Sequence, residues 1–272
     1  MRPNILITSA GQDGQVLRTF QRELDSLLPN GTVLAAGAVP DHLAYAQQLL
    51  DTCISKDVSL GVPTGVEELP KLARHRREFA KEGIAIAVSD PRFVDMTRDK
   101  RTMAHWFRQR GLQTPRAINS AADANFPIVA VPDNNGVNRQ STVVTDAAQF
   151  ASLLLDDPQL MFTEYLSPRE FEAYTVDMCY SEDGTLKLIA ARRAVIPAIA
   201  AWRERVEKFP GARGCITLRL CVHGRTGAVY GIDIKAGFDE DHPHGFGADV
   251  ARTLTQEYLL KKQAEFSRRQ AA

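Results

Sequence analysis

The amino-acid sequence predicts an α/β fold, in which an N-terminal subdomain built on a parallel sheet is followed by two α+β lobes. Short β-rich runs alternate with helical segments through about the first 95 residues, which is typical of a parallel sheet. Paired β-rich runs joined by glycine turns dominate the C-terminal half, which is typical of antiparallel hairpins. The chain of 272 residues is long enough to bury more than one core.

Composition excludes several classes of protein. Lys+Arg and Asp+Glu both number 33, so the formal net charge is zero, and we expect no bulk binding to nucleic acid or to a membrane surface. No apolar stretch approaches the ~20 residues of a membrane span, and the N-terminal apolar run is too short for a signal segment. The four cysteines lack the spacing of a disulfide or zinc framework. We therefore expect a cytoplasmic protein with reduced thiols.

The N-terminal subdomain is predicted from four β-rich runs and the helical segments between them. The first helix is the clearest, because its apolar residues from Val16 to Leu28 recur at the three- and four-residue spacing of one packed face. The predicted strands cover residues 5–8, 32–36, 58–63 and 84–88. Because strands that alternate with helices lie parallel, we expect one parallel sheet.

A glycine turn after the first strand leaves two interpretations open. Gly11 and Gly14 form a G-x-x-G pattern, whereas the dinucleotide-binding fingerprint requires G-x-G-x-x-G. A tight strand-to-helix turn explains the pattern without a ligand, although free N–H groups at the start of a helix also suit a substrate anion. A nicotinamide-binding oxidoreductase is therefore a third and weaker functional alternative.

Lys100 is the first candidate for ligand binding. We expect a helix from about residue 97 to 110, with Thr97 as its N-cap and Gly111 at its C-terminal end. Lys100 then falls in the first helical turn, where a cation opposes the helix dipole. That position is favourable when the lysine faces an anion, and a solvated surface lysine is the alternative interpretation.

Several segments together resemble the ATP-grasp superfamily. Asp99-Lys100 followed by a helix and by Gly111-Leu112-Gln113-Thr114-Pro115 resembles its entry segment, and similar segments extend from Asn4 to Leu254. The chain is similar in particular to the short single-module relatives of the carbamoyl-phosphate synthase large subunit.

The resemblance implies a division of the chain. A pre-ATP-grasp subdomain would occupy residues 1–95, and an ATP-grasp domain would occupy residues 96–272. Within that domain, the small lobe would span about residues 115–165 and the large lobe about residues 166–265.

The resemblance also implies ATP as the cofactor. Lys100 would contact the phosphates, and Glu172 would bind the ribose hydroxyls, with Glu170 as the second choice. The backbone of a hinge strand would read the adenine edge, and its residues would be Glu164, Tyr165 and Leu166.

The metal-binding positions depart from the family pattern. The resemblance places Mg²⁺ ligands on the last two strands, where Asp233 alone keeps a hard oxygen ligand. Arg219 and Lys235 stand at two other ligand positions. Gly237 replaces an arginine, and Val131 stands where a lysine or arginine would bind phosphate. The resemblance therefore implies Mg²⁺, while the residues put its binding in doubt.

The substrate is predicted to be a small carboxylate. Arg192 and Arg193 end a β-rich run, and paired arginines suit a phosphate or a carboxylate. The resemblance implies a catalytic role in which they face the substrate, and a solvated strand end is the alternative. The loop from Asp239 to His244 carries acids and histidines that could bind a metal or act as an acid–base pair. A polar loop explains it equally well.

Two functions of different classes follow. The first is an ATP-dependent carboxylate–amine or carboxylate–thiol ligase, which the resemblance implies would activate its substrate as an acyl phosphate. The second is a catalytically impaired pseudoenzyme that binds a nucleotide or metabolite, or serves as a partner protein. Relatives often dimerise, so a homodimer is one expected assembly.

Overall fold

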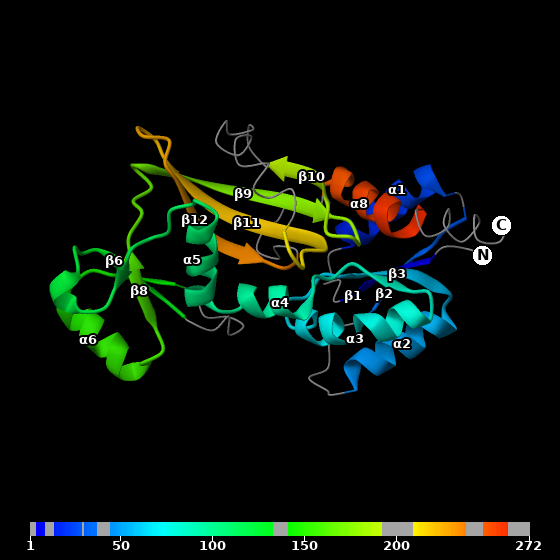
Figure 1. The fold of residues 1–272 in the computed structure, drawn as a ribbon, viewed down its shortest axis with the longest axis horizontal. Coiled ribbons are helices and arrows are strands. Elements are labelled where there is room, and N and C mark those ends of the chain that lie inside the picture. The colour runs from blue at the N-terminus through cyan, green and yellow to red at the C-terminus, as the bar shows by residue number, and fades with distance from the viewer. Residues whose placement is uncertain are drawn as a thin grey trace.

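The computed structural model describes residues 4–8, 14–28, 30–36, 44–132, 141–191, 209–237 and 247–260. These residues form three four-stranded sheets with helices packed around them (Figure 1). One sheet is parallel and N-terminal, and the other two are antiparallel. This arrangement confirms the predicted fold class.

The N-terminal sheet has the strand order β2-β1-β3-β4, and its paired strands are parallel. Its strands are β1 (Asn4–Thr8), β2 (Val33–Ala35), β3 (Val58–Pro63) and β4 (Ala85–Ile86). Strand β4 is shorter than the predicted run. Ile5, Leu6 and Ile7 are all fully buried, as expected for a parallel strand covered on both faces.

Helices cover both faces of this sheet. Ile5 and Ile7 share a core with α1 (Gln15–Leu27) and α8 (Ala248–Leu254), which lie side by side (Figure 1). Leu6 points to the other face, where α2 (Tyr45–Ser55) and α3 (Leu69–Lys81) pack. Helix α8 continues into a π-helical turn, Thr255–Leu260. None of the described helices is long and apolar enough to cross a membrane.

The predicted helix beginning at residue 97 is two helices, α4 (Pro91–Thr97) and α5 (Lys100–Gln109). The prediction of Thr97 as N-cap was wrong, because Thr97 ends α4 and its hydroxyl donates to the Val94 carbonyl at 2.8 Å. The N-cap of α5 is Asp99, whose carboxylate accepts from the Thr102 amide at 2.8 Å. Lys100 is thus the first residue of α5.

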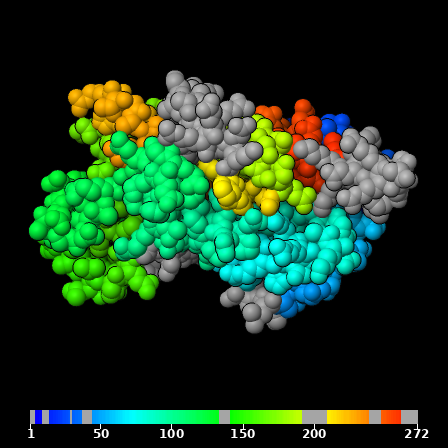
Figure 2. All heavy atoms as spheres, viewed as in Figure 1, coloured from blue at the N-terminus to red at the C-terminus, as the bar shows by residue number. Residues whose placement is uncertain are grey.

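The small lobe is an antiparallel sheet with the order β5-β8-β6-β7. It comprises β5 (Ala117–Ile118), η1 (Ala121–Asp123), β6 (Ile128–Val131), β7 (Thr142–Val144), α6 (Ala147–Asp156) and β8 (Met161–Glu164). Its core is separate from the others and includes Phe150, whose ring is tilted by 42° against the ring of Phe162 at a centroid distance of 4.3 Å. The lobe forms one end of the molecule, in green at the left of Figure 2.

The large sheet has the order β10-β9-β11-β12 and is antiparallel. Its strands are β9 (Phe171–Tyr180), β10 (Leu186–Ala191), β11 (Gly214–His223) and β12 (Val229–Lys235). The turn between β9 and β10 contains Gly184 at φ +80°, so the hairpin predicted from Asp183-Gly184 is confirmed.

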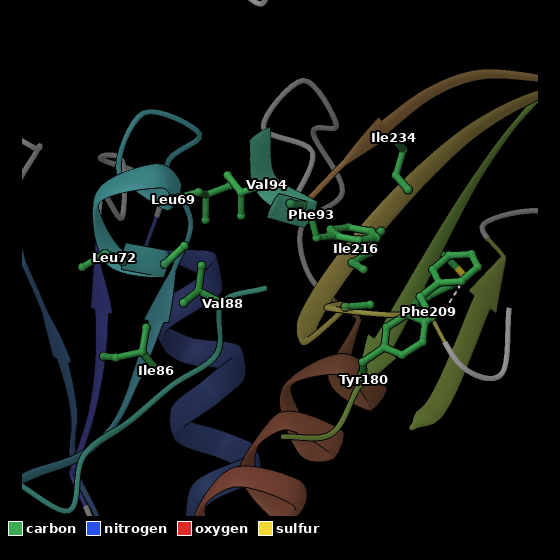
Figure 3. Packing of buried hydrophobic residues seen from close by; sticks show 14 of the residues in the cluster. Leu69, Leu72, Ile86, Val88, Phe93, Val94, Tyr180, Phe209, Ile216 and Ile234 are labelled. Atoms are coloured by element: carbon green, nitrogen blue, oxygen red, sulfur yellow. Dashed lines mark hydrogen bonds between the residues drawn. The ribbon is translucent and has the colours of Figure 1, made fainter. Parts of the chain in front are cut away.

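The N-terminal sheet and the large sheet share one continuous core. Figure 3 shows Ile86 and Leu72 on the N-terminal side, and Ile216, Ile234 and Phe209 on the side of the large sheet. The two parts meet most closely at Gly214, because a Cβ there would lie 2.3 Å from the Ala87 carbonyl oxygen. The core therefore holds the large sheet against the N-terminal subdomain.

Candidate functional site

The large sheet has one apolar and one polar face. Ile216, Leu218 and Leu220 on β11 are buried against α4 and α5. The residues between them point to the opposite face, together with their cross-strand partners. We call this the polar face, and its residues are Thr175, Asp177, Thr217, Arg219, Asp233 and Lys235.

Two cross-strand rows organise the polar face. In the first row, Thr217 lies between Asp177 and Lys235, and its hydroxyl donates to Asp177 Oδ1 at 2.7 Å. In the second row, Arg219 lies between Thr175 and Asp233. Each row therefore carries one acidic and one basic side chain, Asp177 with Lys235 in the first row and Asp233 with Arg219 in the second.

The predicted phosphate lysine and the predicted metal ligand form an ion pair. Lys100 Nζ lies 2.6 Å from Asp233 Oδ1, and each side chain is only 13% exposed. The same carboxylate oxygen accepts from the Ile234 amide at 3.0 Å. The negative charge of Asp233 is thus balanced by a protein cation that lies 133 residues away in the sequence.

The position of Lys100 follows from the packing of α5 against β12. A Cβ at Gly231 would lie 2.4 Å from the Phe107 ring, so the helix approaches this closely only because residue 231 is glycine. At the other end of α5, the Arg110 guanidinium lies 4.0 Å above the Trp106 ring, and burial lowers the pKa of Arg110. These contacts fix α5 with its first turn beside the edge strand β12.

The described residues do not fit a Mg²⁺ ion. Mg²⁺ is usually held by one or two carboxylates, and the Asp233 carboxylate is already paired with Lys100. Arg219 lies directly opposite Asp233, and two unit cations 4 Å apart repel by about 4 kcal/mol at an effective dielectric constant of 20. Among the described residues, no group of three or more His, Cys, Asp or Glu side chains is placed so that it could hold a metal ion.

The hinge strand ends with backbone groups available for a ligand. The Glu164 amide donates to the Arg116 carbonyl at 2.9 Å. Beyond it, Tyr165 and Leu166 make no backbone–backbone hydrogen bond within the described parts of the chain. A purine edge needs such donors and acceptors.

The segment that bonds the hinge also pairs with β12, the strand that carries Asp233 and Lys235. Gln113 pairs with β12, because its amide donates to Val229 and its carbonyl accepts from Gly231. Only two residues lie between Gln113 and Arg116, whose carbonyl accepts from the Glu164 amide, and three residue steps span at most about 10 Å. We treat the hinge and the polar face together as the candidate site, because β12 carries both the contacts with Gln113 and two residues of the polar face.

The structure does not bring Glu172 into this site. Glu172 lies on the same side of β9 as the buried Val176. This is the apolar face of the sheet, opposite to the face that carries Asp233. It is exposed, and its carboxylate accepts from the Tyr174 hydroxyl at 2.7 Å. Glu170, the second candidate for the ribose, lies 3.8 Å from the exposed Arg225. The ribose contact stays a prediction for both.

Other predicted positions are divided between the small lobe and segments outside the described residues. Val131 lies on β6 opposite Met161 and brings no charge. Three other predicted positions lie outside the described residues, namely Arg192, Arg193 and the loop from Asp239 to His244.

Sequence reasoning missed Glu68, which is completely buried. Its carboxylate accepts from the Thr8 hydroxyl at 2.5 Å, the Tyr45 hydroxyl at 2.6 Å, the Thr64 amide at 3.1 Å and the Gly65 amide at 2.9 Å. Burial raises the pKa of Tyr45, and the charge of Glu68 raises it further. The sequence did offer one signal for Glu68, because an acidic residue directly before a helix is favoured by the helix dipole.

Glu68 also limits what the β3–α3 loop can bind. It lies at the carboxyl ends of β1 and β3, the neighbouring strands where the order of the sheet reverses and where α/β proteins commonly bind nucleotides. Its carboxylate accepts hydrogen bonds from the Thr64 and Gly65 amides of the β3–α3 loop. These two amides are therefore not available to a phosphate. This argues against a phosphate at that loop. The glycine turn at residues 11–14, on which the oxidoreductase alternative rests, lies outside the described residues except for Gly14, so that alternative stays untested.

Comparisons with known proteins identify the fold. No family model and no curated protein matches the chain. The biotin carboxylase domain of 2-oxoglutarate carboxylase from Hydrogenobacter thermophilus matches with a TM-score of 0.67 and 13% identity, over 93% of this chain and 69% of that chain. L-amino acid ligase from Bacillus licheniformis matches with a TM-score of 0.62 and 13% identity, over 97% of this chain and 74% of that chain.

A third match supports the same fold. N5-carboxyaminoimidazole ribonucleotide synthetase from Thermotoga maritima has a TM-score of 0.60 and 12% identity, over 95% of this chain and 76% of that chain. Identities this low show the fold alone. The order of one parallel and two antiparallel sheets, together with these matches, shows that the chain has the ATP-grasp fold.

Proposed function

We propose that this chain binds an adenine nucleotide at the candidate site and does not carry out Mg²⁺-dependent phosphoryl transfer. The observation that carries the proposal is the ion pair of Lys100 with Asp233 at 2.6 Å. The pair uses the one carboxylate that the family resemblance assigns to the metal. The protein would then act as a nucleotide-binding pseudoenzyme.

Nucleotide binding is supported by the fold and by the hinge. The matched domain from Hydrogenobacter thermophilus was solved with MgADP, ADP and bicarbonate, and a matched N5-carboxyaminoimidazole ribonucleotide synthetase was solved with ADP. In this chain, the backbone of Tyr165 and Leu166 would contact the adenine, and Lys100 would contact the phosphates.

The loss of phosphoryl transfer is supported by electrostatics. That reaction depends almost wholly on positioning and on neutralising charge, and removing a single preorganised contact costs about 3 kcal/mol of transition-state stabilisation. Val131 brings no charge to a phosphate position. Arg219 and Lys235 stand where the family resemblance places metal ligands, so the expected loss exceeds one such contact.

An ATP-dependent carboxylate ligase is the second candidate. It is favoured by the likeness to L-amino acid ligase from Bacillus licheniformis and by the retention of Lys100 and Asp233. In that function, a small carboxylate would be activated as an acyl phosphate, and Arg192 and Arg193 would hold it. Mg²⁺ would then have to displace Lys100 from Asp233.

Two measurements separate the candidates. Calorimetric titration with ADP measures binding, and hydroxylamine trapping of acyl phosphate from ATP and a panel of small carboxylates measures ligase chemistry. We expect ADP to bind and no hydroxamate to form. Formation of hydroxamate would contradict the pseudoenzyme proposal, and failure of every adenine nucleotide to bind would contradict nucleotide binding.

A gain-of-function variant sharpens the test. The combined substitutions Val131→Lys, Arg219→Glu and Lys235→Asn restore the family pattern at three positions. We expect the triple variant to gain Mg²⁺-dependent ATP hydrolysis that the wild type lacks. If the wild type already hydrolyses ATP and the triple variant does not, the cations of the polar face are part of a working active site.

A further inference from the structure

We infer that the candidate site takes a polyphosphate free of metal, whose phosphate groups draw Lys100 away from Asp233 on binding. The inference builds on the proposed function, but it concerns the phosphate end of the ligand and does not require the base. It makes the ion pair between Lys100 and Asp233 a contact that the ligand opens.

The charges around the polar face favour an uncomplexed polyanion. Among the described residues, Lys100 and the polar face together carry three cations (Lys100, Arg219 and Lys235) and two carboxylates (Asp177 and Asp233). One of the carboxylates, Asp177, has a neutral donor in the Thr217 hydroxyl. A cation surplus of this kind complements a ligand that carries its full negative charge better than one neutralised by Mg²⁺.

The chemistry of the lysine side chain allows the ion pair between Lys100 and Asp233 to open. A lysine ammonium is a point charge on a flexible four-carbon chain, with three N–H donors. Lys100 can therefore turn toward a phosphate oxygen without movement of α5. Asp233 would keep the hydrogen bond from the Ile234 amide at 3.0 Å after Lys100 has turned away. The carboxylate would therefore still have a hydrogen-bond donor.

A divalent cation works against this exchange. An Mg²⁺ ion on the ligand would bring two further positive charges to a face that already carries Arg219 and Lys235. It would also reduce the negative charge that attracts Lys100. Mg²⁺ and the protein cations therefore compete for the same phosphate oxygens.

The experiment measures affinity for tripolyphosphate, ADP and ATP, first in EDTA and then with excess Mg²⁺, at constant ionic strength. The proteins are the wild type, Lys100→Met, Asp233→Asn and the control Lys81→Met, which removes an exposed lysine on α3. We expect the wild type to bind at least tenfold more tightly in EDTA. Lys100→Met should bind about tenfold more weakly there, Asp233→Asn severalfold more tightly, and Lys81→Met like the wild type.

The outcomes separate this inference from the proposed function. Tripolyphosphate binding in EDTA without nucleotide binding would remove the proposed function and leave the inference standing. Nucleotide binding that tightens with Mg²⁺ would overturn the inference and leave nucleotide binding standing. Absence of tripolyphosphate binding in EDTA would also overturn it. If Lys100→Met does not fold, the Mg²⁺ dependence of the wild type and of Asp233→Asn still decides.

Discussion

Two buried carboxylates, Glu68 and Asp233, are held in opposite ways. Glu68 lies in the N-terminal subdomain and accepts hydrogen bonds from neutral hydroxyl and amide groups. Asp233 lies on the large sheet and is balanced by the ammonium group of Lys100. The first carboxylate is fixed by donors that belong to rigid strand and loop ends, whereas the second depends on one flexible side chain.

The difference underlies our proposal that Glu68 is a structural carboxylate and that Asp233 belongs to a ligand site. The backbone amides around Glu68 cannot turn away, so its charge serves to join β1, α2 and the β3–α3 loop. The partner of Asp233 can turn away, because a lysine side chain has many rotamers. Under our proposal, a ligand would therefore replace the partner that Lys100 has in Asp233, whereas the donors of Glu68 would stay in place.

The largest expected effect comes from Glu68→Ala. The substitution leaves the Thr8 and Tyr45 hydroxyls and two loop amides without their acceptor, and each buried unsatisfied donor costs ~1–3 kcal/mol. We expect the free energy of unfolding to fall by about 4 kcal/mol, because the groups relax only in part. Urea denaturation followed by circular dichroism measures it.

The control for this prediction is Glu67→Ala, which removes the adjacent and exposed carboxylate. Surface substitutions of this kind change stability by less than about 0.5 kcal/mol. If Glu68→Ala were as mild as Glu67→Ala, the structural role of Glu68 would be refuted.

The next effect in size is the loss of stability in Lys100→Met. Removing one partner of a buried ion pair costs ~3–5 kcal/mol, and because both side chains keep some exposure, we expect about 3 kcal/mol. The double variant with Asp233→Asn should recover part of this loss. A loss in the double variant equal to the sum of the losses in the two single variants would show that the two groups are not coupled.

A smaller, pH-dependent effect is expected for Tyr45→Phe. The substitution removes a hydrogen bond to a carboxylate, which costs about 2 kcal/mol near neutral pH. Because burial raises the pKa of Tyr45 above its ordinary value, only the unfolded phenol ionises above about pH 10. The stability from Tyr45 is therefore present below pH 10 and is lost as pH rises, by about 1.4 kcal/mol per pH unit.

Denaturation of the wild type and Tyr45→Phe from pH 7 to pH 11 tests this sign. The difference in unfolding free energy should stay constant up to about pH 10 and then shrink. A difference that grew with pH would contradict the raised pKa.

The smallest effect is expected for an exposed carboxylate, Glu170. It lies 3.8 Å from Arg225, and both side chains are more than half exposed. Surface ion pairs of this kind contribute about 0.2–1 kcal/mol, so Glu170→Ala should change the free energy of unfolding by less than about 0.5 kcal/mol. A loss as large as that of Lys100→Met would remove the distinction between buried and exposed carboxylates.

Much of the fold could be predicted because it depends on local patterns. The apolar spacing of α1, the buried β1 run and the Asp183-Gly184 turn each carry a short-range signal, and all three are confirmed. The N-cap prediction failed for a local reason as well. Asp99 is a stronger cap than Thr97, and Pro91 begins a separate helix just before it.

The candidate site was only partly predictable. Sequence patterns singled out Lys100 and Asp233 separately, but their pairing depends on the packing of α5 against Gly231. The orientation of Glu172 depends on the register of β9 with β11, which a single sequence does not reveal. Glu68 was missed because its donors lie up to 60 residues away.

The central claim is that a protein cation stands in place of the metal at Asp233. Calorimetric titration of the wild type with ADP, once in EDTA and once in excess Mg²⁺, tests it most directly. We predict that ADP binds in EDTA and that Mg²⁺ weakens the binding. Binding that appears or tightens only when Mg²⁺ is added would contradict the claim.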